Sequence, residues 1–248
     1  MEIRFDHPAA GLTIQCDFMD HTKVKICGIT SPEDGAAASA AGADAIGLNF
    51  LGGPRRIDLA TAAAILEALP PMVSAVALVE LPWPSALPDL FTRGRGHGPI
   101  RHLQIYGDLK NIDFSASPLR TIQLWPVASV AARSDVMKLS NQVRAWGLIA
   151  SAVVLDTFNG RQRGGTGTVF NWNWIAEARA NGALQGVPPL ILAGGLNPDN
   201  VGAAIRIARP WAVDVSSGVE FPDQPGRKDP ARMRAFIDAV RQAGAGAK

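Results

Sequence analysis

A cysteine and an aspartate each stand at the point where a buried strand should end. Cys27 closes the run VKIC and is followed at once by Gly28, and Asp156 closes VVLD before the polar stretch TFNGRQRGGTG. Both side chains are ionisable, so both are candidates for a functional role if these strand ends form a site. The ordinary alternatives are an inert, packed thiol at Cys27 and a turn-capping carboxylate at Asp156.

Small residues follow two later strand-like runs. AGG (193–195) leads through LNPDN into a helix-like segment, and SSG (216–218) follows the last run. Turns of this kind present backbone N–H groups to an anion, which favours a bound phosphate. The candidate phosphate contacts are Gly194, Gly195, Ser216, Ser217 and Gly218. The GGTG segment (164–167), with Gly165, is either a further backbone contact or a flexible turn.

Eight short apolar or β-branched runs must position these groups. They lie at 23–29, 44–50, 73–79, 100–106, 119–125, 151–156, 189–194 and 211–216. Helix-like segments separate most of them, and the first, SPEDGAAASAAGA, has Ser31 as its N-cap and Pro32 at the first helical position. Strands that alternate with helices are parallel and joined by right-handed crossovers.

This alternation predicts an α/β protein with a single (β/α)8 barrel, a TIM barrel, and a doubly wound open sheet is the alternative. The third and fourth connections, LPWPSALPDLFTRGRGHGP and GDLKNIDFSASP, are rich in proline and glycine or short, so weak or short helices are expected there. Active sites of such barrels lie at the carboxyl ends of the strands, where Cys27, Asp156 and the two small-residue turns would meet.

Two further polar residues fall within predicted strands. Asp214, in DVSSG, is either a polar group that contacts the sugar of a substrate or a buried structural carboxylate. Gln104 either reaches the barrel mouth or is a core amide bonded to the backbone.

Composition excludes several classes of protein. The net charge is only +2 over 248 residues, without a dense basic run, so nothing favours nucleic acid as a partner. No run of about 18 apolar residues could span a bilayer, and the amino terminus lacks a signal-peptide pattern, so a cytoplasmic protein is expected. Two cysteines, Cys16 and Cys27, provide neither a disulfide framework nor a zinc motif.

Six segments, taken in order, resemble the motif series of the phosphoribosylanthranilate isomerase family. They are KICGIT, FLGGPRR, LQIYGD, VVLDTFNGRQRGGTGTVFNW, LAGGLNPDNV and DVSSGVEFPDQPGRKD, and the match runs from about residue 23 to 240. The resemblance implies an aldose–ketose isomerase of tryptophan biosynthesis that needs no metal or organic cofactor. Its substrate would be a phosphorylated aminosugar, N-(5'-phosphoribosyl)anthranilate, and the protein would be a monomer or a homodimer.

The resemblance also implies roles for single residues. Cys27 would be the base and Asp156 the acid of an Amadori rearrangement, and Arg56 would bind the anthranilate carboxylate, although adjacent Arg55 leaves that register open by one. A free thiol has a pKa near 8.5 and an aspartate near 3.9, so we expect the environment to shift both pKa values toward neutrality.

The chain departs from the family pattern at several places. Tyr106 stands where a histidine is common on the fourth strand, and Glu80 ends the third strand where the family tends to be apolar. Residues 1–22 are expected to form an N-terminal extension outside the pattern, in which GLTIQCDF is either an extra strand or a plug across the barrel bottom, and residues 23–248 are expected to form the catalytic barrel. Tyrosine can donate a hydrogen bond to a substrate but cannot carry a proton near neutral pH.

Two other functions stay open at this level. A related phosphosugar isomerase of histidine biosynthesis, or a dual-specificity enzyme, would have an aspartate where Cys27 stands, so the thiol argues against both. A phosphate-binding barrel without catalysis is favoured by Tyr106 and Glu80, and the presence of both Cys27 and Asp156 argues against it.

Overall fold

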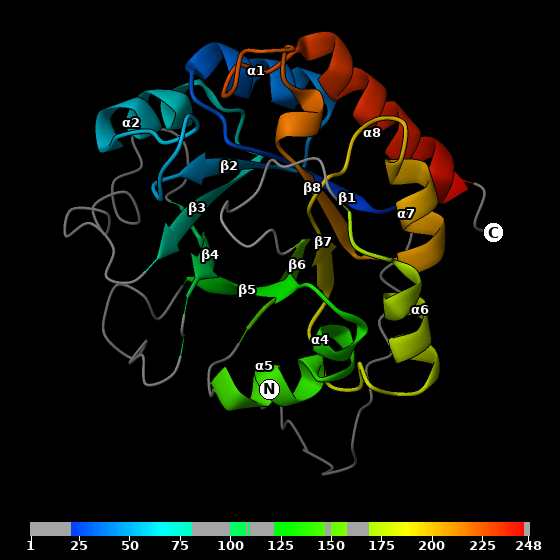
Figure 1. Cartoon of the computed structure of the whole chain (residues 1–248). Helices are drawn as coiled ribbons and strands as arrows, with labels where there is room; N and C mark the ends of the chain where they lie inside the picture. Colours follow the sequence, from blue (N-terminus) through cyan, green and yellow to red (C-terminus); the bar gives the residue numbers. More distant parts are fainter. Residues whose placement is uncertain are drawn as a thin grey trace, which may run out of the picture.

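Eight parallel strands close into a barrel in chain order, from β1 to β8 and back to β1 (Figure 1). The structure is a computed structural model that describes residues 21–80, 100–107, 109, 122–146, 150–157 and 169–245. The closed strand order confirms the predicted TIM barrel and excludes the open doubly wound sheet.

The strands agree with seven of the eight predicted runs to within a few residues at each end. They are β1 (Lys23–Cys27), β2 (Ala45–Asn49), β3 (Ser74–Glu80), β4 (His102–Tyr106), β5 (Gln123–Val130), β6 (Val153–Thr157), β7 (Leu190–Leu192) and β8 (Ala212–Val215). The prediction for the fifth strand was wrong at its carboxyl end, because β5 continues five residues beyond Trp125. Pro126 lies within it, at the point where pairing passes from β4 to β6.

The described helices pack around the outside of the barrel. They are α1 (Pro32–Ala41), α2 (Leu59–Ala68), α4 (Arg133–Met137), α5 (Leu139–Trp146), α6 (Asn173–Ala180), α7 (Val201–Ala208) and α8 (Pro230–Ala245), with a short 3-10 helix η2 (Ser217–Val219) after β8. Ser31 caps α1 as predicted, since its side chain accepts a hydrogen bond from the Asp34 backbone N–H. The third and fourth connections, the Gly165 segment and nearly all of the N-terminal extension lie outside the described residues.

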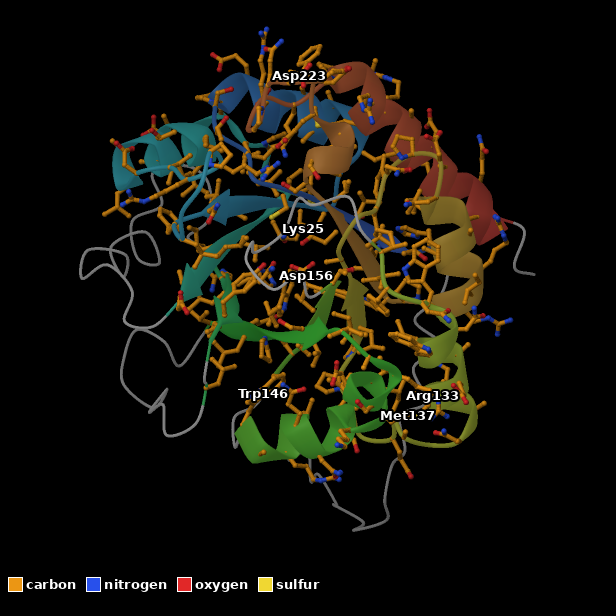
Figure 2. All side chains as sticks on the ribbon, in the orientation of Figure 1. Lys25, Arg133, Met137, Trp146, Asp156 and Asp223 are labelled. Carbon is orange, nitrogen blue, oxygen red and sulfur yellow. The ribbon has the colours of Figure 1, made fainter. Side chains whose placement is uncertain are left out.

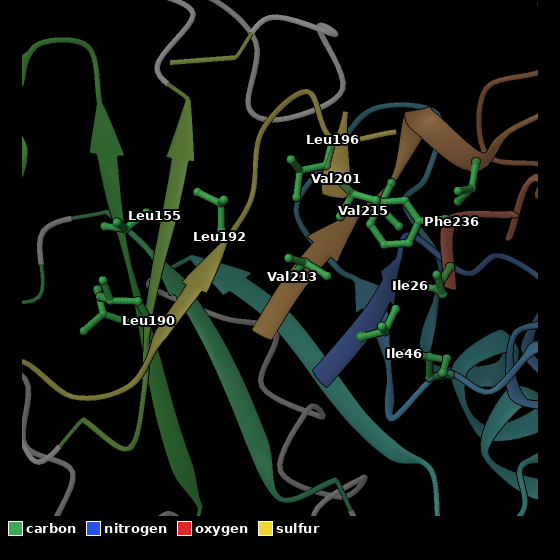
Figure 3. Packing of buried hydrophobic residues seen from close by; sticks show 14 of the residues in the cluster. Ile26, Ile46, Leu155, Leu190, Leu192, Leu196, Val201, Val213, Val215 and Phe236 are labelled. Atoms are coloured by element: carbon green, nitrogen blue, oxygen red, sulfur yellow. The ribbon is translucent and has the colours of Figure 1, made fainter. Parts of the chain in front are cut away.

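The main hydrophobic core lies between the strands and the helices. Outward-facing strand residues pack against the helices, as Ile26 and Val215 do beside Phe236 of α8 (Figure 3). A second, smaller cluster fills the amino-terminal end of the barrel and includes Val76, Trp125 and Ile191. Both clusters follow from the period of two in a strand, which sends alternate side chains to opposite faces.

The barrel interior changes from apolar to polar along its axis. Trp125 lies at the amino-terminal end of the strands, called the lower end here, and contacts the rings of His102 and Trp211. Above it, toward the carboxyl ends of the strands, the buried side chains of the interior include Lys25, Gln104 and Asp214, and then Cys27 and Asp156. Figure 2 shows Lys25 and Asp156 within the ring of strands. Polar groups are therefore gathered at the end where barrel enzymes have their active sites.

No helix in the described part of the chain is long and apolar enough to cross a membrane.

Candidate active site

Cys27 ends β1 and lies in the barrel interior, where its residue is 7% exposed. A side chain on the neighbouring β2 residue Gly47 would collide with it, because an added Cβ would lie 2.7 Å from the Cys27 Sγ and 3.1 Å from the Lys25 Nζ. Glycine at position 47 therefore leaves the space that the thiol and the amino group occupy.

Lys25 lies two residues before Cys27 on the same face of β1 and was not predicted as a site residue. Its Nζ donates to the Asp214 Oδ2 at 2.8 Å, and its side chain also hydrogen-bonds Cys27. The main chains of Lys25 and Asp214 are register partners in the β1–β8 pair. Asp214 is thus a buried interior carboxylate, and its second oxygen, Oδ1, has no hydrogen-bond partner among the described residues.

Asp156, on β6, is a buried carboxyl group at the same end of the barrel, 8% exposed. Burial, followed by the negative charge of Asp214, raises the pKa of Asp156 to about 6, while the Thr157 backbone N–H and Lys25 oppose the shift. The expected shift toward neutrality is confirmed in direction for Asp156. A carboxyl group with this pKa can carry a proton to a substrate near neutral pH.

The corresponding expectation for Cys27 is wrong. Burial is the largest influence and raises the pKa of the thiol above its ordinary value, and the charge of Asp214 raises it further. Lys25, by its charge and its hydrogen bond, and then Lys228 oppose this rise. The sequence places Cys27 at a strand end but does not show how deeply its thiol is buried. Burial disfavours the charged thiolate and so raises the pKa, independently of the motif in which the cysteine stands.

Tyr106 and Gln104 face the same space from β4. The Gln104 Nε2 donates to the Tyr106 hydroxyl at 2.9 Å, and the Gln104 Oε1 is buried without a donor among the described residues. Burial and then the nearby charges of Asp156, Cys27 and Asp214 raise the pKa of Tyr106 well above 10. The phenol therefore keeps its proton and, since it accepts from Gln104, has that proton available for donation.

Arg55, and not Arg56, reaches this cluster. Arg56 is exposed in the loop after β2, where it forms an isolated bridge with Asn49. The Arg55 Nε and Nη2 donate to the two carboxylate oxygens of Glu220, each at 2.7 Å, and the Arg55 charge acts on Cys27. Of the two arginines that the sequence left open, Arg55 is therefore the one whose side chain lies beside Cys27 and Glu220, and Arg56 lies exposed in the same loop.

Glu220 and Lys228 form a second buried ion pair that sequence reasoning missed. The Lys228 Nζ donates to the Glu220 Oε1 at 2.9 Å and to the Ser216 carbonyl at 3.1 Å, and its side chain is wholly buried. The Ser216 hydroxyl in turn donates to the Cys27 carbonyl at 3.0 Å. The cluster ties the ends of β1 and β8 to the Arg55 loop. The available signal was a single charged residue, Glu220, within the otherwise apolar segment GVEF, and Lys228 eight residues later in GRKD.

The two small-residue turns predicted to bind phosphate lie against each other. A Cβ on Gly218 would lie 2.0 Å from the Leu196 carbonyl oxygen, so only glycine permits this approach of the β8 turn to the β7 turn. No acceptor among the described residues is found for the backbone N–H of Gly194 or Gly195. Of the other predicted phosphate contacts, Ser216 hydrogen-bonds the Cys27 carbonyl and the Lys228 amino group, and Ser217 begins η2. Gly165 lies outside the described residues.

Comparison with known proteins identifies the family. Residues 101–239 match the N-(5'phosphoribosyl)anthranilate (PRA) isomerase family. An N-(5'-phosphoribosyl)anthranilate isomerase of Pseudomonas aeruginosa (strain UCBPP-PA14) is 38% identical over 227 residues, which cover 90% of this chain and 97% of that protein. The chain belongs to this family. The corresponding isomerase of Geobacter sulfurreducens is 40% identical over 216 residues, which cover 87% of this chain and 96% of the relative.

Solved structures of phosphoribosylanthranilate isomerases have the same fold. The enzyme from Thermotoga maritima superimposes with a TM-score of 0.68 at 30% identity, covering 89% of this chain and 99% of that one. A phosphoribosylanthranilate isomerase in complex with reduced 1-(o-carboxyphenylamino)-1-deoxyribulose 5-phosphate gives a TM-score of 0.65 at 29% identity, with the same coverage. The family resemblance of the six motifs is thereby confirmed.

Proposed function

We propose that this isomerase converts N-(5'-phosphoribosyl)anthranilate into 1-(2-carboxyphenylamino)-1-deoxyribulose 5-phosphate, a step of tryptophan biosynthesis, with Asp156 as the acid and Cys27 as the base. The observation that carries the proposal is the placement of two buried proton-exchanging groups at one end of the barrel, which share Asp214 and Tyr106 as charged or polar neighbours. Membership of the family supports the choice of substrate.

The reaction needs one proton delivered and one removed. Asp156 gives its proton to the ring oxygen, the C1–O bond breaks, and the anilino nitrogen lone pair forms the C=N bond of an iminium ion. The Cys27 thiolate then takes the proton from C2, and that C–H electron pair forms the C1=C2 bond of an enolamine, neutralising the nitrogen. Tautomerisation of the enolamine gives the ketose. The raised pKa of Asp156, about 6, supports the first step because the carboxyl group is protonated in part at neutral pH.

Arg55 is suited to the anthranilate carboxylate. Glu220 occupies the edge of the guanidinium formed by Nε and Nη2. The edge formed by Nη1 and the second hydrogen of Nη2 is left for a second carboxylate, which a planar guanidinium can bind through two parallel hydrogen bonds. Glu220 therefore orients Arg55 for the substrate.

The sugar and its phosphate would lie between these groups. The backbone N–H groups of Gly194 and Gly195, next to the turn that contains Gly218, support phosphate binding after β7 and β8. Tyr106 can donate to a sugar hydroxyl, and Gln104 and Asp214 each have a buried oxygen without a donor among the described residues. These three residues are proposed to bind the sugar.

The proposed domain division places an N-terminal extension at residues 1–22 before a barrel of residues 23–248. Coverage by the relatives supports it, since 97% of the Pseudomonas aeruginosa relative matches 90% of this chain.

A coupled fluorescence assay that follows loss of the anthranilate adduct tests the function. Cys27→Ser and Asp156→Asn should each lower kcat by at least about a hundredfold, as expected for loss of a positioned base or acid. Cys16→Ser, outside the family motifs, is the matched control and should keep the parent rate. A parent protein that is inactive on this substrate, or that prefers the histidine-pathway aminoaldose, would overturn the proposal.

A further inference from the structure

Lys25 is a buried cation without an assigned task in the reaction. It is 2% exposed in the middle of β1, and its amino group contacts Asp214 on β8 and Cys27 two residues further along its own strand. Residues two apart on a strand face the same side, so the lysine and the cysteine project into the barrel together. The amino group and the sulfur both lie against Gly47, where the Cβ of a larger residue would collide with the sulfur.

Stability does not explain this ion pair. Desolvation of two buried charges generally offsets their attraction, and replacement by apolar residues of similar size is often neutral or stabilising. The pair is also incompletely satisfied, because the Asp214 Oδ1 has no donor among the described residues. At the other end of the barrel an apolar cluster that includes Val76, Trp125 and Ile191 fills the interior without an ion pair among the described residues, so the fold itself does not require buried charges.

We propose that Lys25 is a positioning residue that holds the Cys27 sulfur and supplies the positive charge that allows its thiolate to form, and that Asp214 holds Lys25 in place. This inference rests on the proposed role of Cys27 as the base. Lys25 is not a catalytic residue in this account, since it acts through the sulfur.

Charged and titratable groups face Cys27 from several elements, and their effects have opposite signs. Lys25 on β1 and Lys228, which follows β8, favour the thiolate, and Lys25 has the larger effect. Asp214 on β8 opposes it. Arg55 from the loop after β2 and Tyr106 on β4 also interact with the sulfur. Removal of Lys25 and removal of Asp214 should therefore shift the thiol titration in opposite directions.

The test is a thiol titration, followed by absorbance near 240 nm and by the rate of iodoacetamide alkylation against pH. Every variant carries Cys16→Ser, which leaves Cys27 as the only thiol of the chain. Lys25→Met should raise the thiol pKa and slow alkylation at pH 8 by at least about tenfold, the change that one pKa unit gives. Asp214→Asn keeps a side-chain oxygen that can accept the hydrogen bond from Lys25 and removes only the negative charge, so it should lower the thiol pKa and accelerate alkylation. Lys25→Arg, which keeps the charge, should stay close to the parent.

The double variant Lys25→Met/Asp214→Asn is the matched control, because it removes both buried charges together. It should fold even if Lys25→Met alone does not, and its thiol pKa should lie between those of the two single variants. Shifts in the same direction for Lys25→Met and Asp214→Asn, or no shift in either, would show a merely structural pair and overturn the inference.

The titration needs no enzymatic activity, so it separates this inference from the proposed function. If Lys25→Met and Asp214→Asn shift the thiol pKa in opposite directions while Cys27→Ser stays active, Cys27 is not the base. The effect of the two buried charges on the thiol would still stand. Where the base is established, Lys25→Met should lower kcat at least about tenfold with little change in KM, in line with the lost thiolate, and Lys25→Arg should restore most of that loss.

Discussion

Replacement of Asp156 by asparagine should make the folded protein more stable at neutral pH, although it removes a buried hydrogen-bonding group. Asp156 has a pKa of about 6 in the folded state, against an ordinary value of 3.8. Each pKa unit corresponds to about 1.36 kcal/mol, so ionised Asp156 costs the folded state about 3 kcal/mol at pH 7. Asparagine has the same shape and no charge to desolvate.

The sign follows from proton binding. Between pH 4 and pH 6 the folded state holds the Asp156 proton and the unfolded state has lost it, so the free energy of unfolding falls as the pH rises through this range. The contribution is fully present below about pH 4 and is lost above about pH 6. The stability difference between Asp156→Asn and the parent should therefore grow from near zero at pH 4 to about 3 kcal/mol at pH 7.

Urea unfolding at several pH values from 4 to 8 measures this difference. Asp199→Asn, at an exposed carboxylate before α7, is the matched control, because it makes the same chemical change where no charge is buried. A variant that is less stable than the parent at pH 7, or a difference that does not change with pH, would refute the reasoning that burial raises the pKa of Asp156. Asp156→Asn should also lose activity, so the ionisable group that the reaction needs makes the folded protein less stable at neutral pH.

Three further outcomes are expected. The profile of kcat/KM against pH should be bell-shaped, with an acid limb near pH 6 from Asp156 and an alkaline limb above the ordinary cysteine range; a rate that is constant from pH 5 to 7 would contradict this. Gly47→Ala should lower kcat by about a hundredfold because its Cβ would displace the Cys27 sulfur, and a circular dichroism spectrum like that of the parent is needed to show that the fold persists. Glu220→Gln should raise KM at least about tenfold by releasing Arg55, and the effect should vanish with a substrate that lacks the ring carboxylate; an equal effect on both substrates would exclude the carboxylate role.

Pattern in the sequence was sufficient for the barrel and for the position of its active end. Cys27 and Asp156 could be found because each breaks an apolar run where a strand ends, and parallel strands bring such ends together. The carboxyl-terminal part of β5 was missed because Pro126 cannot donate to a ladder and usually marks the end of a strand.

The charges inside the site could not be predicted in the same way. Lys25 stands in an alternating strand, KVKIC, where a polar residue is compatible with either face, so only the closed barrel shows that it is buried. Which of Arg55 and Arg56 points toward Cys27 depends on the direction of one loop. The raised pKa of Cys27 depends on its burial and on the charge of Asp214, which is 187 residues away in the chain. Long-range contacts of this kind leave no local signal.

The central claim is that Cys27 and Asp156 act on one bound sugar from opposite sides. A crystal structure of this chain with reduced 1-(o-carboxyphenylamino)-1-deoxyribulose 5-phosphate measures that directly. The account predicts the Cys27 sulfur beside C2 of the sugar, and the Asp156 carboxyl group on the other side within hydrogen-bond reach, about 2.6 to 3.2 Å, of the sugar oxygen that leaves the ring. A sugar bound with both groups on one side, or with either group separated from it by other side chains, would contradict the account.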